Sequence, residues 1–176
     1  MKTHLILATI CLSGLLVGCQ NQFETIFGDL PGEGVLTPVE ISGSGLPDET
    51  FTGESFQALA QSFLTGSAPV LEDYAVIVND AQAFREAEEK TGYQLPAIDF
   101  EKYSLVIGKW LSPMFQVLYL KSQRVVKEKG EVTLYLRIGD MKMLTTQPGG
   151  QVPRYFGALY EKLPDGPVKV IRWDDF

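Results

Sequence analysis

The sequence predicts an α+β domain, with a mostly antiparallel β-sheet that forms a sandwich or a partly open barrel and carries two short helices. Three observations predict it. Apolar residues follow the 3.6-residue period of a helix over residues 54–64 and 81–91. Short apolar runs and alternating patterns, which are typical of strands, fill most of the chain after residue 73. Glycine and proline turns separate those runs, as expected of strands in antiparallel order.

The beginning of the chain predicts export. Lys2 places a positive charge at the front, and an apolar run follows over residues 5–17. This run of roughly 13 residues is too short to span the ~30 Å hydrocarbon core of a membrane, which needs about 20 helical residues. A charged start, a short apolar run and small residues at its end are the parts of a secretory signal.

The end of this signal, Leu-Val-Gly-Cys at positions 16–19, resembles the lipobox that lipoprotein signal peptidase recognises. The resemblance implies that residues 1–18 are removed and that the new first residue, Cys19, carries a diacylglycerol thioether and an acyl chain on its amino group. Several acyl chains anchor a protein firmly to lipid. Gln20 stands where an Asp would resemble an inner-membrane retention signal. We therefore expect attachment to the bacterial outer membrane, facing the periplasm or the cell surface.

Cleavage at this point would also remove reactive side chains. His4 is the only histidine of the sequence, and Cys11 is the only cysteine besides the lipidated one. The mature chain would then lack the Ser-His-Asp and Cys-His arrangements of hydrolases and the usual histidine or cysteine metal sites. The sequence also has no phosphate-binding glycine loop and no EF-hand loop. We expect no catalytic residue, no metal and no cofactor.

Charge is distributed unevenly along the chain. Residues 20–89 contain 13 acidic side chains and one basic side chain, a net charge of −12. Residues 90–176 contain 13 basic and 9 acidic side chains, a net charge of +4. An acidic protein gains nothing from a phosphate backbone, so we expect no nucleic-acid partner.

The first part of the mature chain reads as an arm, and the helices follow it. Residues 19–53 are rich in Pro, Gly and Ser and predict a tether or loosely packed arm, with a short edge strand at 35–41 that contains Pro38. The folded domain is expected over residues 54–176.

Its two helices flank a strand at 74–78. Asn79 or Asp80 would cap the second helix, and Gly92 would follow its C-cap.

The remainder predicts strands. They are expected at 103–109, 115–126, 131–139, 154–163 and 167–173, with 141–146 extending or pairing the third of them. A hairpin turn is expected at 128–130 and a loop at 147–150. The turn at 164–166, Pro-Asp-Gly, is of the kind that joins antiparallel strands.

One passage carries a resemblance. Ile98-Asp99-Phe100, followed by the apolar strand that ends at Gly108, resembles the PrcB family, the C-terminal domain of a bacterial protease-complex subunit with lipoprotein relatives in Bacteroidetes. The resemblance would cover residues 74–173, and Pro153-Arg154-Tyr155 matches the family's proline-containing loop. Residues 111–115 depart from the family's Gly-Gly-Tyr passage. The resemblance implies a non-catalytic binding or accessory module.

Carboxylates offer a second interpretation. Asp99 and Glu101 are two residues apart and Asp174 and Asp175 are adjacent, and paired carboxylates can cleave glycosides. Asp99 is better explained as an acceptor for backbone N–H groups in a turn, with Phe100 in the core. Calcium could be held by oxygen ligands from Asp48, Glu49 and Glu54, or from Glu72 and Asp73, although neither group forms a loop motif.

Aromatic residues near the predicted loops suggest recognition. The stretches 110–115 and 147–155 are predicted to be loops that carry recognition, because loops carried by a rigid sheet commonly bind ligands. Trp110, Phe115, Arg154 and Tyr155 are the predicted binding residues in them. The favoured function is a membrane-anchored, non-catalytic envelope lipoprotein that binds another protein, with a protease among the candidate partners. The alternatives are a surface lipoprotein that binds carbohydrate or captures nutrients, and a hydrolase that uses carboxylates alone.

Overall fold

The computed structural model describes residues 26–28, 34–39, 54–66, 71–114, 118–140 and 150–175. The chain divides into two units, Met1–Val35 and Leu36–Phe176. Cys19, most of the predicted arm, Phe115, the predicted strand at 141–146 and nearly all of the loop at 147–150 lie outside the described residues. The elements are β1 (Val35–Leu36), α2 (Glu54–Leu64), β2 (Tyr74–Val78), α3 (Ala81–Thr91), β3 (Tyr103–Pro113), β4 (Leu118–Glu128), β5 (Glu131–Asp140), β6 (Gln151–Glu161) and β7 (Val168–Asp175).

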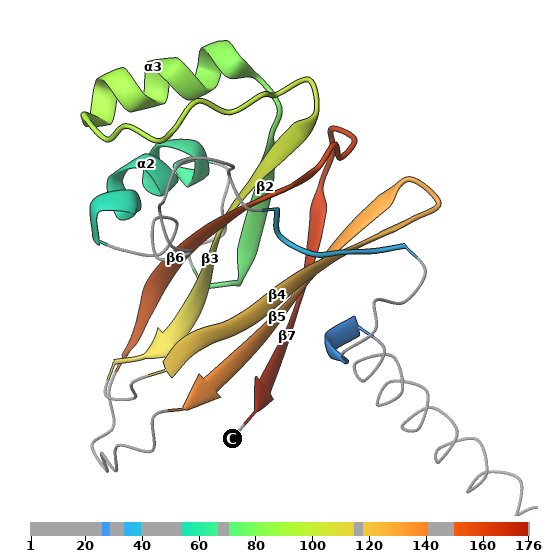
Figure 1. Ribbon diagram of the computed structural model, residues 1–176. Coiled ribbons are helices and arrows are strands. Elements are labelled where there is room, and N and C mark those ends of the chain that lie inside the picture. Colours follow the sequence, from blue (N-terminus) through green and yellow to red (C-terminus); the bar gives the residue numbers. More distant parts are fainter. Residues whose placement is uncertain are drawn as a thin grey trace, which may run out of the picture. The chain divides into compact units, whose positions relative to one another are not determined.

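The strands form two sheets, which confirms the predicted α+β class (Figure 1). One sheet has the order β1-β4-β5-β7 and the other has the order β2-β3-β6. β2 and β6 pair with β3 in antiparallel fashion, and β4 pairs with β5 likewise. β7 is the exception, because it lies parallel to β5.

Two apolar clusters hold the second unit together. One fills the space between the sheets with large side chains from both, among them Phe156, Tyr160, Leu134 and Ile138. The other lies between the outer face of the β2-β3-β6 sheet and the two helices. In Figure 1, α2 and α3 lie on the same side of that sheet. The three-stranded sheet is therefore buried on both faces, and β3 accordingly reads as a nearly continuous apolar run.

The two predicted helices are confirmed, and so are the predicted caps of α3. Asp80 is the N-cap of α3, and its Oδ1 accepts hydrogen bonds from the N–H groups of Gln82 (2.8 Å) and Ala83 (3.2 Å). Gly92 ends the helix at a φ of 71°, which a glycine adopts without steric cost. The predicted hairpin turn is also present, with positive φ at Lys129 and Gly130 between β4 and β5.

The turn at 164–166 does not join neighbouring antiparallel strands, so that prediction is wrong. β6 belongs to the three-stranded sheet, whereas β7 enters the other sheet and pairs with β5. The reason is visible at the turn, where Asn79 of the β2–α3 junction donates hydrogen bonds to the carbonyl of Leu163 and to Asp165. These bonds hold the chain at the end of one sheet while β7 departs into the other.

Part of the predicted arm lies in the second unit. Leu36 packs against the cluster between the sheets, and the Val39 N–H donates to the Leu159 carbonyl of β6 at 2.7 Å. β6 is an edge of its sheet, so Val39 occupies a backbone acceptor on that edge. The short β1 is an edge strand, as predicted, but it ends at Leu36 and does not contain Pro38, so the predicted extension through that proline is wrong.

Candidate functional site

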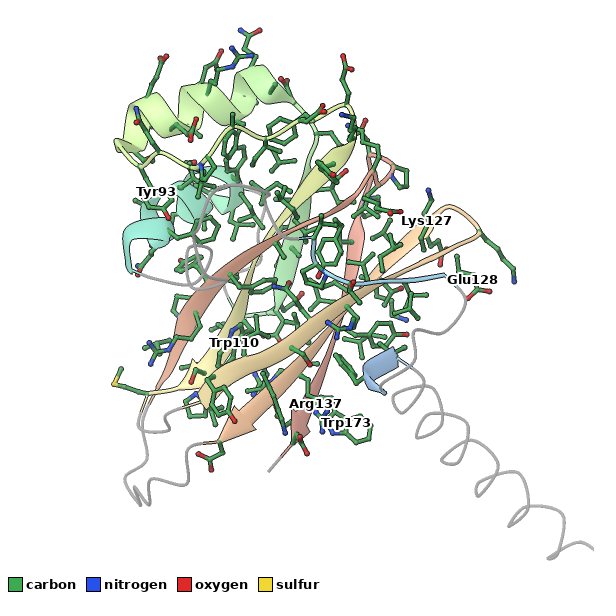
Figure 2. The ribbon with its side chains drawn as sticks, viewed as in Figure 1. Tyr93, Trp110, Lys127, Glu128, Arg137 and Trp173 are labelled. Carbon is green, nitrogen blue, oxygen red and sulfur yellow. The ribbon has the colours of Figure 1, made fainter. Side chains whose placement is uncertain are left out.

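Trp110 does not lie on an accessible loop. β3 continues to Pro113, so the predicted loop at 110–115 is a strand over most of its length. The Trp110 side chain is 3% exposed and packs in the cluster between the sheets, where Figure 2 shows it. The Arg172 guanidinium lies 5.4 Å from the centroid of its ring and donates to the Leu111 carbonyl. Trp110 is therefore a core residue with a cation on its outer side.

Of the other predicted binding residues, Phe115 lies outside the described residues, Arg154 is a cross-strand neighbour of Trp110, and Tyr155 lies apart from both. Arg154 is exposed and lies opposite Trp110 in the β3–β6 pairing, so their side chains share one face of the sheet. Tyr155 points to the other face, where it packs against the cluster under the helices and its hydroxyl accepts from Gln61 Nε2 at 3.3 Å. The structure thus separates Tyr155 from Trp110 by the thickness of the sheet.

The predicted carboxylate pairs are engaged in local contacts. Asp99 accepts the Glu101 N–H at 3.1 Å and pairs with Lys102 at 3.0 Å, and the hydrogen bond from Lys102 lowers the pKa of Asp99. This is the turn role that the sequence favours, and Phe100 packs in the core as expected. Asp175 is held by Lys121 and Arg137, whose hydrogen bonds lower the pKa of Asp175. A lowered pKa keeps a carboxyl ionised, which suits an ion pair better than a proton donor.

The predicted calcium ligands are accounted for only in part. Asp73 accepts the Leu111 N–H at 2.8 Å, so its carboxylate caps a backbone group where β2 begins. Asp48, Glu49 and the side chain of Glu54 lie outside the described part of the structure. Among the described residues, no group of three or more His, Cys, Asp or Glu side chains is placed to hold a metal ion.

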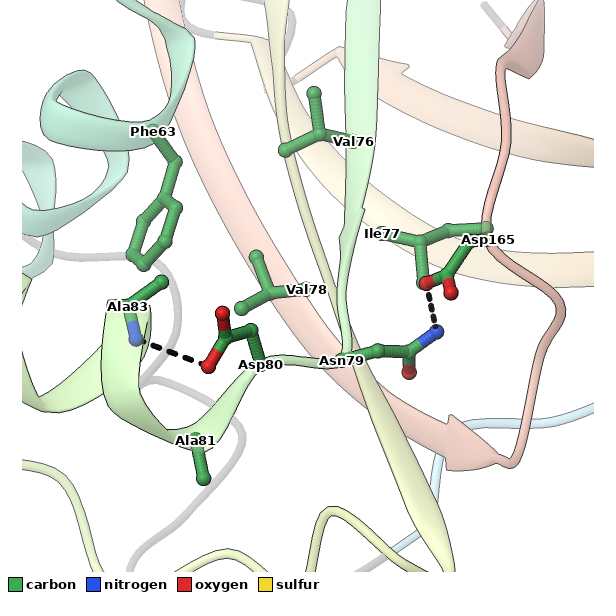
Figure 3. A pocket seen from close by; sticks show the side chains of 9 residues that line it. All are labelled: Phe63, Val76, Ile77, Val78, Asn79, Asp80, Ala81, Ala83 and Asp165. Carbon is green, nitrogen blue, oxygen red and sulfur yellow. Dashed lines mark hydrogen bonds between the residues drawn. The ribbon is translucent and has the colours of Figure 1, made fainter.

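The structure presents a different candidate site, an open groove beside β2 with a volume of about 620 Å³ (Figure 3). Val76, Ile77 and Val78 all line it. Because successive side chains of a strand point to opposite faces, three consecutive residues can line one groove only if it follows the edge of the strand. The groove therefore lies along the backbone edge of β2. Its full lining is Phe63, Val76, Ile77, Val78, Asn79, Asp80, Ala81, Ala83 and Asp165.

The groove has an apolar side and a polar end. Phe63 of α2 and Ala83 of α3 lie on the side toward which Val78 points in Figure 3. Phe63 is fixed there by stacking on Phe84, with ring centroids 6.4 Å apart. At the polar end, Asp165 accepts from Asn79 Nδ2 at 2.7 Å.

A buried network positions this polar end. The Ser104 hydroxyl, fully buried in β3, donates to Asn79 Oδ1 at 2.5 Å and accepts from the Leu163 N–H at 2.8 Å. Asn79 Nδ2 in turn donates to the Leu163 carbonyl at 3.1 Å and to Asp165. The network joins the end of β2 to β3 and to the β6–β7 turn, so the carboxylate of Asp165 is placed by the core of the fold.

β2 is an edge strand of the β2-β3-β6 sheet. β7 lies beside it but belongs to the other sheet and forms no ladder with it. At the opposite edge of the sheet, Val39 bonds to β6, whereas in the described part of the chain no segment bonds to the outer edge of β2 in this way. An edge strand presents the N–H and C=O groups of every second residue outward, and these groups border the groove.

Sequence reasoning missed this site for a physical reason. The five residues of β2, Tyr-Ala-Val-Ile-Val, read as a compact buried strand, and their composition does not show which neighbour they lack. Only the strand order reveals the free edge. One signal was present, since the acidic cap Asp80 and the turn residue Asp165 lie shortly after the ends of β2 and β6, two strands of the same sheet.

The chain matches no protein-family model, and searches of curated proteins and of solved structures gave no match either. The resemblance to the PrcB family therefore stays a prediction. None of the helices in the described part of the chain is long and apolar enough to cross a membrane.

Proposed function

We propose that this protein is a lipid-anchored, non-catalytic lipoprotein of the bacterial outer membrane, and that it binds another protein through the groove beside β2. The groove is the observation that carries the proposal. It combines apolar side chains, backbone groups of an edge strand and two carboxylates, Asp80 and Asp165, in one open site. Apolar surface with a few placed polar groups is the usual composition of a binding site.

The groove also suits a protein partner better than a glycan. Glycan binding rested on aromatic residues grouped in loops, but Trp110 is buried and Tyr155 lies on the opposite face of the sheet. The one aromatic side chain that lines the groove, Phe63, stacks on Phe84. Carbohydrate binding stays an alternative prediction without a site among the described residues, and the resemblance to a protease-complex subunit makes a protease one candidate partner.

Site-specific photocrosslinking in the native membrane tests the proposal. The photoreactive amino acid p-benzoylphenylalanine is placed at Phe63, an aromatic replacement for an aromatic residue in the groove. A matched variant carries it at Tyr119, an exposed aromatic residue on β4 of the other sheet. We expect a discrete adduct with one protein from position 63 and none of the same mass from position 119. Equal adducts from both positions, or none from position 63, would contradict the proposal.

A further inference from the structure

From the same groove we infer how the partner binds: an extended peptide segment adds to β2 as a new strand and places a Lys or Arg side chain against Asp165. This inference rests on the proposed function and specifies its mode of recognition and its ligand class. Strand addition derives affinity from main-chain hydrogen bonds and specificity from pockets for alternate side chains.

β2 carries none of the sequence features that usually protect an edge strand, and β7, which lies beside it, forms no ladder with it. Proteins block exposed edges with Lys or Pro residues, bulges or a covering segment, because a free edge pairs with other chains. The sequence of β2, Tyr-Ala-Val-Ile-Val, contains no charge and no proline, and its pairing with β3 runs without a bulge from Tyr74 to Val78. β6, at the other edge of the sheet, contains Pro153 and bonds to Val39. Among the described residues, the edge without these sequence features and without a hydrogen-bonded segment is thus the one that faces the groove.

The side chains of the groove indicate what the added strand would carry. On the helix side, Phe63, Val76 and Ala83 offer an apolar surface for the small or branched apolar side chains of an extended segment. No Lys or Arg is among the residues that line the groove. Neither of its carboxylates forms an ion pair among the described residues.

Asp165 is the better partner for a cation. Asp80 is committed to the N-terminus of α3, where it accepts two backbone N–H groups and its charge balances the helix dipole. Asp165 is exposed in the turn, and among the described residues it accepts only from the neutral Asn79 amide. A cationic side chain at the end of the bound strand would complement this charge.

Charge also argues against two other occupants. A second copy of this chain, paired through its own β2, would bring two acidic grooves together. Residues 40–53 of this chain carry Glu40, Asp48 and Glu49 and no basic residue, so they lack the required charge. The inference therefore commits to a basic extended peptide from a different protein.

Peptide binding by the lipidated full protein in nanodiscs tests this inference. The first probe is a fluorescent seven-residue peptide of alternating Val and Thr with a Lys at each end. The second probe carries Glu in place of each Lys, and the third carries Pro in place of the central residue. We expect the Lys peptide to bind, the Glu peptide to bind at least about tenfold more weakly, and the Pro peptide to lose binding. Amide hydrogen exchange of β2 should slow by about tenfold or more with the Lys peptide.

Two variants test whether Asp165 causes the preference for the Lys peptide over the Glu peptide. Asp165→Asn keeps an oxygen that can accept from Asn79 and removes the charge, so the Lys and Glu peptides should then bind within about twofold of each other. Glu131→Gln, an exposed site at the β4–β5 hairpin, should leave the preference unchanged.

The outcomes separate the inference from the proposed function. The inference would be overturned if the lipidated protein without substitutions bound the Lys and Glu peptides equally. It would also be overturned if peptide binding slowed amide hydrogen exchange in strands other than β2. Protection of β2 that rises with protein concentration and without peptide would overturn it in favour of self-association. If position 63 still crosslinks to a protein in the membrane, the proposed function survives that result. If that crosslink is also missing, both fail.

Discussion

The hydroxyl of Ser104 on β3 donates a hydrogen bond to Oδ1 of Asn79, the residue that follows β2, across 2.5 Å. This bond fixes the Asn79 amide so that its NH₂ group reaches the Leu163 carbonyl. The end of the candidate binding strand is therefore tied to the core of the domain.

Asn79→Ala should destabilise the protein. The change removes the acceptor for the proton of the buried Ser104 hydroxyl and the donor to the Leu163 carbonyl, and a buried polar group left unsatisfied costs about 1–3 kcal/mol. Urea unfolding followed by circular dichroism measures the free energy of unfolding. Gln82→Ala, which removes an exposed contact with Glu86 on α3, serves as the control and should change it by less than about 0.5 kcal/mol. Equal values for the two variants would show that the network contributes no stability.

Tyr160→Phe should leave the protein as stable or make it more stable. The Tyr160 side chain is fully buried between the sheets, and its hydroxyl has no hydrogen-bond partner in the described part of the chain. Burial also raises the pKa of this hydroxyl, so it stays neutral. Removing an unsatisfied buried hydroxyl gains on the order of 1 kcal/mol. Thermal unfolding would reveal the change, and a clear loss of stability would mean that the hydroxyl does have a partner.

Gly108→Ala should destabilise the strand beside the groove. A Cβ at this position would lie 2.8 Å from Cε1 of Phe156 and 2.8 Å from the backbone carbonyl of Tyr74. The carbonyl belongs to β2, so relief of the clash would push β2 away from β3. Overpacking of this kind costs about 1–3 kcal/mol. Gly150→Ala is the control, because its nearest neighbour would lie 4.0 Å away. A small effect at Gly108 would indicate that β2 moves easily.

Arg137→Gln should raise the pKa of Asp175 toward the ordinary value of 3.8. In the folded protein, hydrogen bonds from Lys121 and Arg137 lower this pKa, so the ion pairs favour the folded state above pH 3.8 and their effect is lost as the pH falls through the lowered value. Carboxyl NMR titration measures the pKa directly. Lys102→Gln provides the crossed control, since it should raise the pKa of Asp99 and leave that of Asp175 unchanged. A shift of both carboxyls in either variant would contradict the assignment.

Local features of the fold could be predicted because they depend on neighbours in the sequence. The helices α2 and α3 have the predicted bounds, and Asp80 and Gly92 cap α3 as expected. The strand predicted at 131–139 is present as β5, and its alternating apolar residues Val132, Leu134, Leu136 and Ile138 lie in the cluster between the sheets.

Pairing between distant strands could not be predicted in the same way. Nothing in residues 164–166 shows that β7 leaves the sheet of β6, because this depends on bonds from Asn79, far away in the sequence. Trp110 was misplaced for a related reason. A tryptophan at the end of an apolar run can cover a loop or fill a core, and only the second sheet packed against β3 decides between them. The groove lies along the edge of β2, and the sequence does not show that β2 is an edge strand, so no motif predicts the groove.

Mass spectrometry of the protein purified from its native membrane tests the proposed lipid anchor. The proposed location at the outer membrane and the removal of His4, the only histidine, both depend on this anchor. We predict a chain that begins at Cys19 and carries a diacylglyceryl group on the sulfur and an acyl chain on the amino group. A chain that retains residues 1–18, or one with an unmodified Cys19, would contradict the account.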